Sequence, residues 1–249
     1  MIDRFNTVEK IAPVLAKRHV LFLDFDGTLA PLQDDPDTVF LPQGGEECLC
    51  GLARQLDGAL VLISGRGLQD LSLRAPIDVW RAGGHGQDVC QPGEMPDDTG
   101  EAAPIILVNA VENLIRDFEG VRLEQKGKVL AIHYRQNPIA GPELAEAAEQ
   151  LSGSANGYLS QHGNRVIELK PVGADKGTAL TALMSRSPFS GRVPVMIGDD
   201  TTDEDAMRAA QELGGIGIKV GDGETCAEYR FDNTETVWRW LREQWNEHA

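Results

Sequence analysis

The stretch Asp24-Phe25-Asp26-Gly27-Thr28 directly follows the apolar run His19 to Leu23, and this junction decides the fold class. A short apolar run that ends in carboxylates and a glycine predicts a buried strand leading into an acidic loop. A second junction of the same kind occurs where Val193 to Ile197 leads into Gly198-Asp199-Asp200-Thr201-Thr202-Asp203. Carboxylates at the carboxyl ends of two such strands meet in the crevice where open α/β sheets bind ligands.

Strands and helices alternate in both the N-terminal and the C-terminal part of the chain. The first part has apolar runs over 20–23, 59–63 and 79–82, a helix expected near 46–55 and a short helix expected over 9–17. The last part has an expected helix over 176–184, strand over 193–197, helix over 203–213, strand over 216–220 and amphipathic helix over 236–245. This alternation is typical of an α/β domain with a parallel sheet.

The middle of the chain has a different pattern. Residues 91–100 are rich in Pro, Gly and Asp and predict a linker. Beyond them, a helix over 105–118 leads to strands over 121–124 and 129–134, and a helix over 142–151 leads to strands over 157–161 and 165–169. The polar turns between the paired strands predict hairpins. We therefore expect a core domain of residues 1–100 and 173–249, interrupted by an α+β unit of residues 101–172.

The charge balance of the chain limits the classes of partner that it is expected to bind. Its 249 residues include 23 Lys and Arg against 39 Asp and Glu, which gives a net charge of −16. Such a surface repels polyanions, so neither nucleic acid nor an acidic membrane is an expected partner, whereas a small phosphorylated ligand can bind beside a local cation. No basic and apolar leader pattern opens the sequence, and no apolar run nears the ~18 residues that span a bilayer. We expect a cytoplasmic monomer whose four cysteines are reduced.

The first acidic loop offers two carboxylates with different roles. If the strand continues through the loop, Asp24 and Asp26 lie on the same side and can reach one site. An ionised Asp24 can attack phosphorus, and Asp26 can give a proton to the leaving oxygen and later activate water. Gly27 lets the backbone turn closely around a phosphate, and Thr28 offers a hydroxyl. Taken alone, these residues also fit an ordinary polar turn after a strand.

Three further groups could complete a phosphate site. Ser64 follows a buried run at an expected helix N-terminus, where backbone N–H groups bind anions, although serine is also an ordinary N-cap. Lys176 opens a helix and would place a cation where phosphoryl charge accumulates, although a lysine at a helix start is usually solvated. Asp199 and Asp203 could bind Mg²⁺ through one or two carboxylates, although acidic residues also cap a first turn.

Together these motifs resemble those of the haloacid-dehalogenase (HAD) phosphohydrolases and, within them, the trehalose-6-phosphate phosphatases. The order of the Asp pair, the serine, the lysine and the Asp cluster carries the first likeness. The second is carried by Asp24-Phe25-Asp26-Gly27-Thr28-Leu29-Ala30-Pro31, Ser64-Gly65-Arg66, His85-Gly86, His133-Tyr134-Arg135, Glu168-Leu169-Lys170-Pro171, Asp175-Lys176-Gly177 and Gly198-Asp199-Asp200-Thr201-Thr202-Asp203-Glu204-Asp205-Ala206. Two positions differ from the family's common pattern: Gln87 stands where an acidic residue is frequent, and Lys170 where arginine is common.

The resemblance implies a fold and a set of site residues. The fold is a Rossmann-like HAD core with a parallel sheet, plus an inserted α+β cap domain that closes over the sugar. The implied catalytic residues are Asp24 as nucleophile, Asp26 as general acid/base, and Ser64 and Lys176 as groups that orient the phosphoryl. The implied Mg²⁺ ligands are Asp24, the backbone carbonyl of Asp26, Asp199 and Asp203. The implied substrate contacts are Thr28, Arg66, His85, Gly86, Lys126, His133, Arg135 and Glu168.

The implied function is Mg²⁺-dependent hydrolysis of trehalose 6-phosphate through an aspartyl-phosphate. Within the enzyme class, the alternatives are a HAD phosphatase for another sugar phosphate, such as sucrose 6-phosphate, and a phosphomutase, which shares the first chemical step. A non-catalytic sensor that binds a phosphosugar is the alternative of a different class. Every expected catalytic position carries the required residue type, which favours an enzyme.

Overall fold

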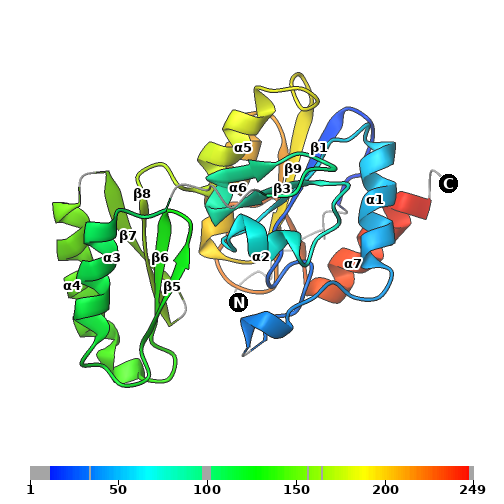
Figure 1. Ribbon diagram of the computed structural model, residues 1–249. Coiled ribbons are helices and arrows are strands. Elements are labelled where there is room, and N and C mark those ends of the chain that lie inside the picture. Colours follow the sequence, from blue (N-terminus) through cyan, green and yellow to red (C-terminus); the bar gives the residue numbers. More distant parts are fainter. Residues whose placement is uncertain (1–11, 34, 97–101, 156, 164, 247–249) are drawn as a thin grey trace, which may run out of the picture.

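The computed structural model describes residues 12–33, 35–96, 102–155, 157–163 and 165–246. Its larger sheet has the strand order β11-β10-β9-β1-β2-β3-β4 (Figure 1). The strands are β1 (His19–Leu23), β2 (Leu60–Ile63), β3 (Trp80–Gly83), β4 (Asp88–Cys90), β9 (Val193–Gly198), β10 (Ile216–Val220) and β11 (Tyr229–Phe231). The pairs within this sheet are parallel except for β3 with β4, as the α/β alternation of the sequence predicts.

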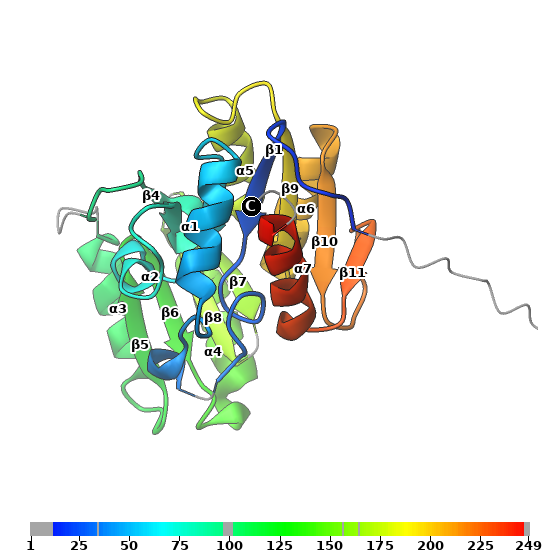
Figure 2. The ribbon, with the colours of Figure 1, turned by 90° about the vertical axis from the view of Figure 1, so that its right-hand side faces the viewer.

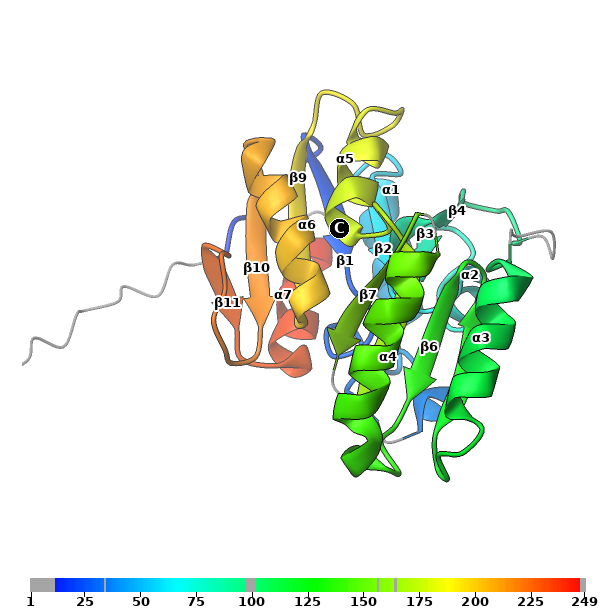
Figure 3. The same cartoon turned by 90° about the vertical axis from the view of Figure 1, so that its left-hand side faces the viewer.

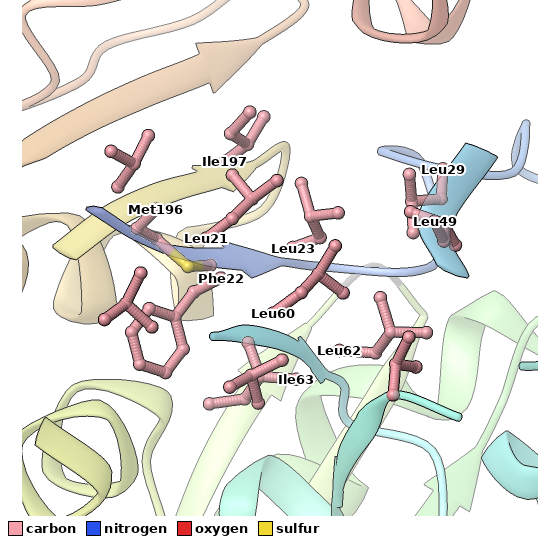
Figure 4. Packing of buried hydrophobic residues seen from close by; sticks show 14 of the residues in the cluster. Leu21, Phe22, Leu23, Leu29, Leu49, Leu60, Leu62, Ile63, Met196 and Ile197 are labelled. Atoms are coloured by element: carbon pink, nitrogen blue, oxygen red, sulfur yellow. The ribbon is translucent and has the colours of Figure 1, made fainter. Parts of the chain in front are cut away.

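Strand β1 lies at the centre of this sheet and is buried along its whole length. Leu21 pairs with Leu60 of β2 on one side and with Val195 of β9 on the other. Figure 4 shows the apolar side chains of these three strands packed together. Each large aliphatic side chain that is fully buried contributes about 1.5–3 kcal/mol, so the continuous apolar runs fix these strands inside the sheet.

Helices cover both faces of the larger sheet. Helices α1 (Gly45–Gln55) and α7 (Thr234–Asn246) lie on one face (Figure 2), and α5 (Lys176–Met184) and α6 (Thr201–Glu212) on the other (Figure 3). The chain runs from β1 outward to β2 and β3, and later returns to β9 on the opposite side of β1. The carboxyl ends of β1 and β9 therefore form a topological switch point, the usual ligand-binding place of such sheets.

A second, antiparallel sheet forms from the middle of the chain. Its strand order is β5-β6-β8-β7, and Figure 1 shows its helices on the side away from the larger sheet. The elements are α3 (Ile105–Ile115), β5 (Arg122–Lys126), β6 (Val129–His133), α4 (Gly141–Ser154), β7 (Tyr158–Gly163) and β8 (Val166–Pro171). Both predicted hairpins are confirmed.

Alternation along these strands separates an apolar face from a polar one. Leu130 and Ile132 of β6 and Leu169 of β8 are fully buried in the cluster that also contains side chains of α3 and α4. The neighbouring positions of opposite parity include Glu124 and Glu168, which face the other way. The second sheet thus packs its apolar face on its own helices and leaves a polar face for contact with the rest of the molecule.

The structure corrects the expected helix over 9–17. Residues 9–11 lie outside the described part of the chain, and residues 12–16 are not helical. Pro13 accounts for the break at Ala12, because proline disfavours helical backbone at the residue before it. The short edge strands β4 and β11 were not predicted. Among the described helices, none combines the length and apolar character that crossing a bilayer requires.

Candidate active site

Three carboxylates meet at the switch point of the larger sheet. Asp24 follows β1, Asp199 follows β9, and Asp203 lies in the first turn of α6. One oxygen from each of the three lies within 4.8 Å of the other two. Asp24 is only 4% exposed and Asp203 is fully buried. The sequence predicted that these groups meet, and the structure confirms it.

One buried cation contacts two of these carboxylates. Lys176 begins α5, where the side chain of Asp175 caps the helix by accepting a hydrogen bond from the backbone N–H of Thr178. The Lys176 Nζ donates to Asp24 Oδ1 and to Asp203 Oδ1, both at 2.6 Å. Burial alone would lower the pKa of Lys176, but the two carboxylates raise it, so the side chain stays charged.

The cluster still carries more negative than positive charge. Burial and the nearby charge of Asp203 raise the pKa of Asp24, although Lys176 opposes this. The same two causes raise the pKa of Asp199 to about 6. Three carboxylates against one ammonium, with oxygen donors alone, suit a hard divalent cation, which would relieve this repulsion.

Asp203 has a supporting position within the cluster. Its Oδ1 accepts from Lys176, and its Oδ2 accepts from the backbone N–H groups of Asp199 and Asp200, each at 3.0 Å. Asp200 is the N-cap of α6, forms a capping box with Asp203, and is exposed. Both oxygens of Asp203 are therefore occupied in holding Asp199 and Lys176, so the capping role considered from the sequence is also realised.

Gly27 allows the first acidic loop to approach Asp199. Its backbone has φ = 82°, and a Cβ at this position would lie 2.1 Å from Asp199 Oδ2. A side chain is excluded on both grounds. The next residue, Thr28, is buried with its Oγ1 3.5 Å from Asp199 Oδ1. The two acidic stretches of the sequence therefore touch directly.

Asp26 has a different neighbour from the one that the sequence suggested. We expected its carboxylate beside Asp24, but both of its oxygens accept hydrogen bonds from Arg66, at 2.7 Å from Nε and 2.6 Å from Nη2. Asp26 does not belong to the group formed by Asp24, Asp199 and Asp203. Arg66, expected to contact substrate, is instead engaged with this carboxylate in the structure.

Ser64 lies at the carboxyl end of β2 and is buried. Its Oγ accepts a hydrogen bond from the backbone N–H of Arg66 at 3.1 Å. Helix α2 (Leu68–Ser72) begins only after Gly67, so Ser64 precedes the helix and is not its N-cap. The expectation of a helix N-terminus at Ser64 is corrected, while its place at the edge of the sheet beside the acidic loop agrees with the sequence.

A polar contact joins the second sheet to the core. His85, in the short helix η2 (Gly84–Gly86), lies with its Nε2 2.8 Å from Glu168 Oε2 on β8. Lys126 on β5 lies 3.8 Å from Glu168 Oε1. Burial alone would raise the pKa of Glu168, but His85 and two lysines lower it to about 2. The polar face of the second sheet is thus turned toward the core loops.

The remaining predicted residues are spread over this region. His133 pairs with Glu124 at 2.7 Å on the polar face of the second sheet. Arg135 follows β6 and is exposed. Gly86 has φ = 90°, and a Cβ there would lie 2.1 Å from the Cβ of Ala179. Its lack of a side chain lets η2 pack closely on α5.

Lys219 was missed by the sequence reasoning. It lies on β10, is 5% exposed, and its Nζ donates to the backbone carbonyl oxygens of Asp199 and Val220. A lysine near the end of an otherwise apolar strand was the available signal. Its ammonium helps to hold the backbone that carries Asp199.

Comparisons with known proteins agree with this geometry. The sequence model of the family described as trehalose-phosphatase matches residues 22–234. The chain is 37% identical over 238 residues to a trehalose-6-phosphate phosphatase of Escherichia coli (strain K12), covering 92% of this chain and 87% of the relative. It is 37% identical over 211 residues to a probable trehalose-phosphate phosphatase of Sinorhizobium fredii (strain NBRC 101917 / NGR234), covering 84% and 80%.

Solved structures show the same fold at lower sequence identity. The C-terminal domain of a trehalose-6-phosphate phosphatase from C. albicans matches with a TM-score of 0.79 at 19% identity, covering 93% of each chain. A haloacid dehalogenase-like hydrolase from Bacteroides thetaiotaomicron matches with a TM-score of 0.67 at 17% identity, covering 90% of this chain and 99% of the other. The fold is therefore that of a HAD-like hydrolase, as predicted. Within that class, the chain belongs to the trehalose-phosphatase family.

Proposed function

We propose that this protein hydrolyses trehalose 6-phosphate to trehalose and phosphate, with Asp24 as nucleophile. The observation that carries the proposal is the buried Asp24 at the switch point, held by Lys176 and grouped with Asp199 and Asp203. Transfer of a phosphoryl group to a carboxylate requires that the carboxylate be ionised and that nearby groups offset the negative charge of both. The relatives at 37% identity carry the name of this activity, which supports the choice of substrate.

The reaction proceeds in two displacements at phosphorus. In the first, a carboxylate oxygen of Asp24 forms a bond to phosphorus, the bond to the sugar oxygen breaks, and Asp26 gives that oxygen a proton. In the second, water attacks phosphorus, Asp26 takes a proton from the water, and the bond to Asp24 breaks. Lys176 and Ser64 orient the phosphoryl oxygens through their N–H and O–H donors.

Mg²⁺ is the cofactor that we infer for the acidic cluster. Asp24 and Asp199 would hold it together with the backbone carbonyl of Asp26, while Asp203 stands behind them with both oxygens hydrogen-bonded. When bound, the ion offsets the charge of the phosphoryl group and of the carboxylates around it.

Mg²⁺ is expected to stabilise the folded protein. The pKa of about 6 for Asp199 exceeds that of an unfolded aspartate, so without a divalent cation the folded state loses stability as pH rises from about 4 through 6. Saturating Mg²⁺ offsets this loss and gives about 2.7 kcal/mol at a hundred times its Kd, which raises the thermal midpoint by several degrees. Thermal unfolding in EDTA and in Mg²⁺ at pH 5 and 7 measures both effects.

The matched variant for this measurement is Asp199→Asn. It removes the ionisation and the proposed ligand together, so we expect a smaller Mg²⁺ shift and a weaker decline between pH 5 and 7. Equal Mg²⁺ shifts in both proteins would show that the ion binds elsewhere.

We also infer that residues 101–172 act as a cap domain that selects the sugar, with residues 1–100 and 173–249 as the catalytic core. The separate apolar cluster of the middle segment supports this division. The polar face that carries Lys126, His133 and Glu168 supplies donors and acceptors for sugar hydroxyls, with Arg135 beyond the end of its strand. From the core side, the inferred substrate contacts are Thr28, His85 and Gly86.

The contact from His85 to Glu168 bears on how the cap works. It ties the proposed cap to a core loop beside Ser64, because a Cβ at Gly65 would lie 2.9 Å from the imidazole. A cap held against the core by this contact would exclude water from the site while the sugar is bound.

Phosphate release from a panel of sugar phosphates tests the substrate. With Mg²⁺, we expect kcat/KM for trehalose 6-phosphate to exceed that for glucose 6-phosphate by at least ~100-fold, because a site built to hydrogen-bond a second sugar rejects a ligand that lacks it. Rates within a few-fold of each other would refute the specificity. Preference for sucrose 6-phosphate, isomerised product, or binding without turnover would identify the other phosphatase, the mutase or the sensor, respectively.

We infer further that the protein is a cytoplasmic monomer whose partner is a small phosphosugar, without nucleic acid or membrane partners. The net charge of −16 bears on the partners alone, since it repels nucleic acid and acidic membranes. Light scattering coupled to size-exclusion chromatography would give the mass of one chain.

A further inference from the structure

We propose that Arg66 is a positioning residue for Asp26, braced from behind by Asp70 and Arg74, and does not contact the sugar phosphate. The proposal rests on the proposed function, in which Asp26 is the proton donor and acceptor. It reassigns Arg66 from the substrate contact that the sequence suggested to a part of the catalytic frame.

Arg66 and Asp26 form a bidentate pair. Arg66 Nε lies 2.7 Å from Asp26 Oδ2, and Arg66 Nη2 lies 2.6 Å from Asp26 Oδ1, so two N–H groups on one edge of the guanidinium donate to both oxygens of the carboxylate. This bidentate arrangement fixes the rotation of the carboxylate as well as its distance. A single hydrogen bond, or a lysine, would leave that rotation free.

Asp70 and Arg74 support Arg66 on the side away from Asp26. Its Nη1 donates to Asp70 Oδ2 at 2.6 Å, and Asp70 Oδ1 accepts from Arg74 Nε at 3.0 Å and Nη2 at 2.7 Å. Arg74 Nη1 in turn donates to the backbone carbonyls of Asp37 and Val39. Arginine and aspartate therefore alternate from the loop after β1 through α2 to the segment after the short helix η1 (Pro36–Thr38).

The two arginines in this chain of charges are buried. The Arg66 and Arg74 side chains are 9% and 6% exposed. Burial alone would raise the pKa of Asp70, but its hydrogen bonds with both arginines lower it, so the carboxylate between them stays ionised. Arg74 also lies over the Phe40 ring, 4.9 Å from its centroid. The two buried arginines are held by several hydrogen bonds each and have little freedom to rearrange, which makes them suitable to position a reacting group, although Asp26 and Asp70 are 29% and 38% exposed.

The N–H donors of Arg66 are almost all engaged with protein groups. A guanidinium has five N–H donors. Within the described residues, four of those of Arg66 are used: one each by the two Asp26 oxygens, one by Asp70 and one by the carbonyl of Pro36 at 3.0 Å. A group so fully engaged with protein has little capacity left for a phosphate or a sugar hydroxyl.

The test is a double-mutant cycle on the full-length protein with Mg²⁺. Arg66→Met removes the fork, and we expect kcat on trehalose 6-phosphate to fall about 10²-fold with KM changed less than ~3-fold, because misplacing an acid/base group by about 1 Å has this effect. In an Asp26→Asn background the same change should cost less than ~3-fold, since Arg66 then has no catalytic group to position. All four proteins of the cycle are assayed with trehalose 6-phosphate, so that both costs of Arg66→Met are measured in the same reaction.

Further variants keep the result interpretable. Arg66→Lys retains the charge without the fork, and we expect it to restore only part of the loss. Asp70→Asn keeps the shape of the side chain that supports Arg66, and we expect it to lower kcat by ~10-fold. This variant replaces Arg66→Met as the test if circular dichroism shows that Arg66→Met does not fold. Arg208→Met, which removes an exposed pair with Asp205, is the control expected to leave kcat and KM unchanged.

Three outcomes would overturn the proposal. A rise in KM with unchanged kcat in Arg66→Met would make Arg66 a substrate contact. Equal losses with and without the Asp26→Asn change would show that Arg66 acts independently of this carboxylate, and full activity in Arg66→Met and Asp70→Asn would show that no brace is needed. If the unmodified protein instead prefers another phosphomonoester, the proposed substrate fails, and the cycle is measured with that ester.

Discussion

Asp24→Asn abolishes phosphate release from trehalose 6-phosphate, with an expected loss of about 10⁴-fold or more, as found when a nucleophile is removed. The amide keeps the size and shape of the carboxylate, so substrate still binds, but its oxygen does not attack phosphorus. The fold should not suffer. Burial and Asp203 raise the pKa of Asp24, so its ionised form is a source of repulsion in the folded state.

The measurement is steady-state phosphate release together with thermal unfolding. We expect the variant to unfold at the same temperature as the unmodified protein or a higher one in EDTA, because it removes one of three crowded carboxylates. The matched control is Asp205→Asn, the same chemical change at an exposed carboxylate on α6. Turnover in Asp24→Asn above about one per cent of the control would show that another group attacks phosphorus.

Lys176→Met should produce the largest loss of stability among the site variants. It removes the ammonium that lies 2.6 Å from both Asp24 and Asp203 and leaves two buried carboxylates without their cation. Breaking a buried pair in this way costs about 3–5 kcal/mol, equivalent to a drop of roughly 10 °C in the thermal midpoint. Activity should fall at least ~100-fold, because a charge that offsets the phosphoryl group is gone.

Urea unfolding of Lys176→Met beside Lys17→Met measures this effect. Lys17 pairs with Asp57 at 3.1 Å, but its side chain is 74% exposed, so that substitution should change stability by less than about 0.5 kcal/mol. Mg²⁺ should recover part of the stability of Lys176→Met by offsetting the same carboxylates, but little of its activity. Equal stability of the two variants would contradict the buried network described here.

The elements that the sequence predicted well are those whose pattern is set locally. The fully apolar runs of β1 and β9 left no alternative to buried strands, and the helix expected over 176–184 coincides with α5, whose N-cap Asp175 was visible in the sequence. Short edge strands such as β11 carry three residues and no clear alternation, so nothing local marks them. Pro13 was a local signal against helical backbone at Ala12, within the helix expected over 9–17.

Some contacts of the candidate site likewise follow from the sequence pattern, and others depend on how side chains turn and how the two sheets pack. That Asp24 and Asp199 meet follows from strand topology, because both stand at the carboxyl ends of adjacent parallel strands. The pairing of Asp26 with Arg66 depends on which way two side chains turn after the strands end, and the sequence does not encode that choice locally. The contact of His85 with Glu168 joins residues 83 positions apart, one in the short helix η2 and the other on β8 of the second sheet, so it depends on how the second sheet packs against the core loops.

A rapid acid quench of the protein during turnover of trehalose 6-phosphate labelled at phosphorus, followed by mass spectrometry of its peptides, shows whether Asp24 is the nucleophile. We expect the quenched protein to carry a phosphoryl group on Asp24, formed within one turnover and absent from the Asp24→Asn variant. Phosphate released at the full rate without label on the protein, or label carried by a residue other than Asp24, would contradict it.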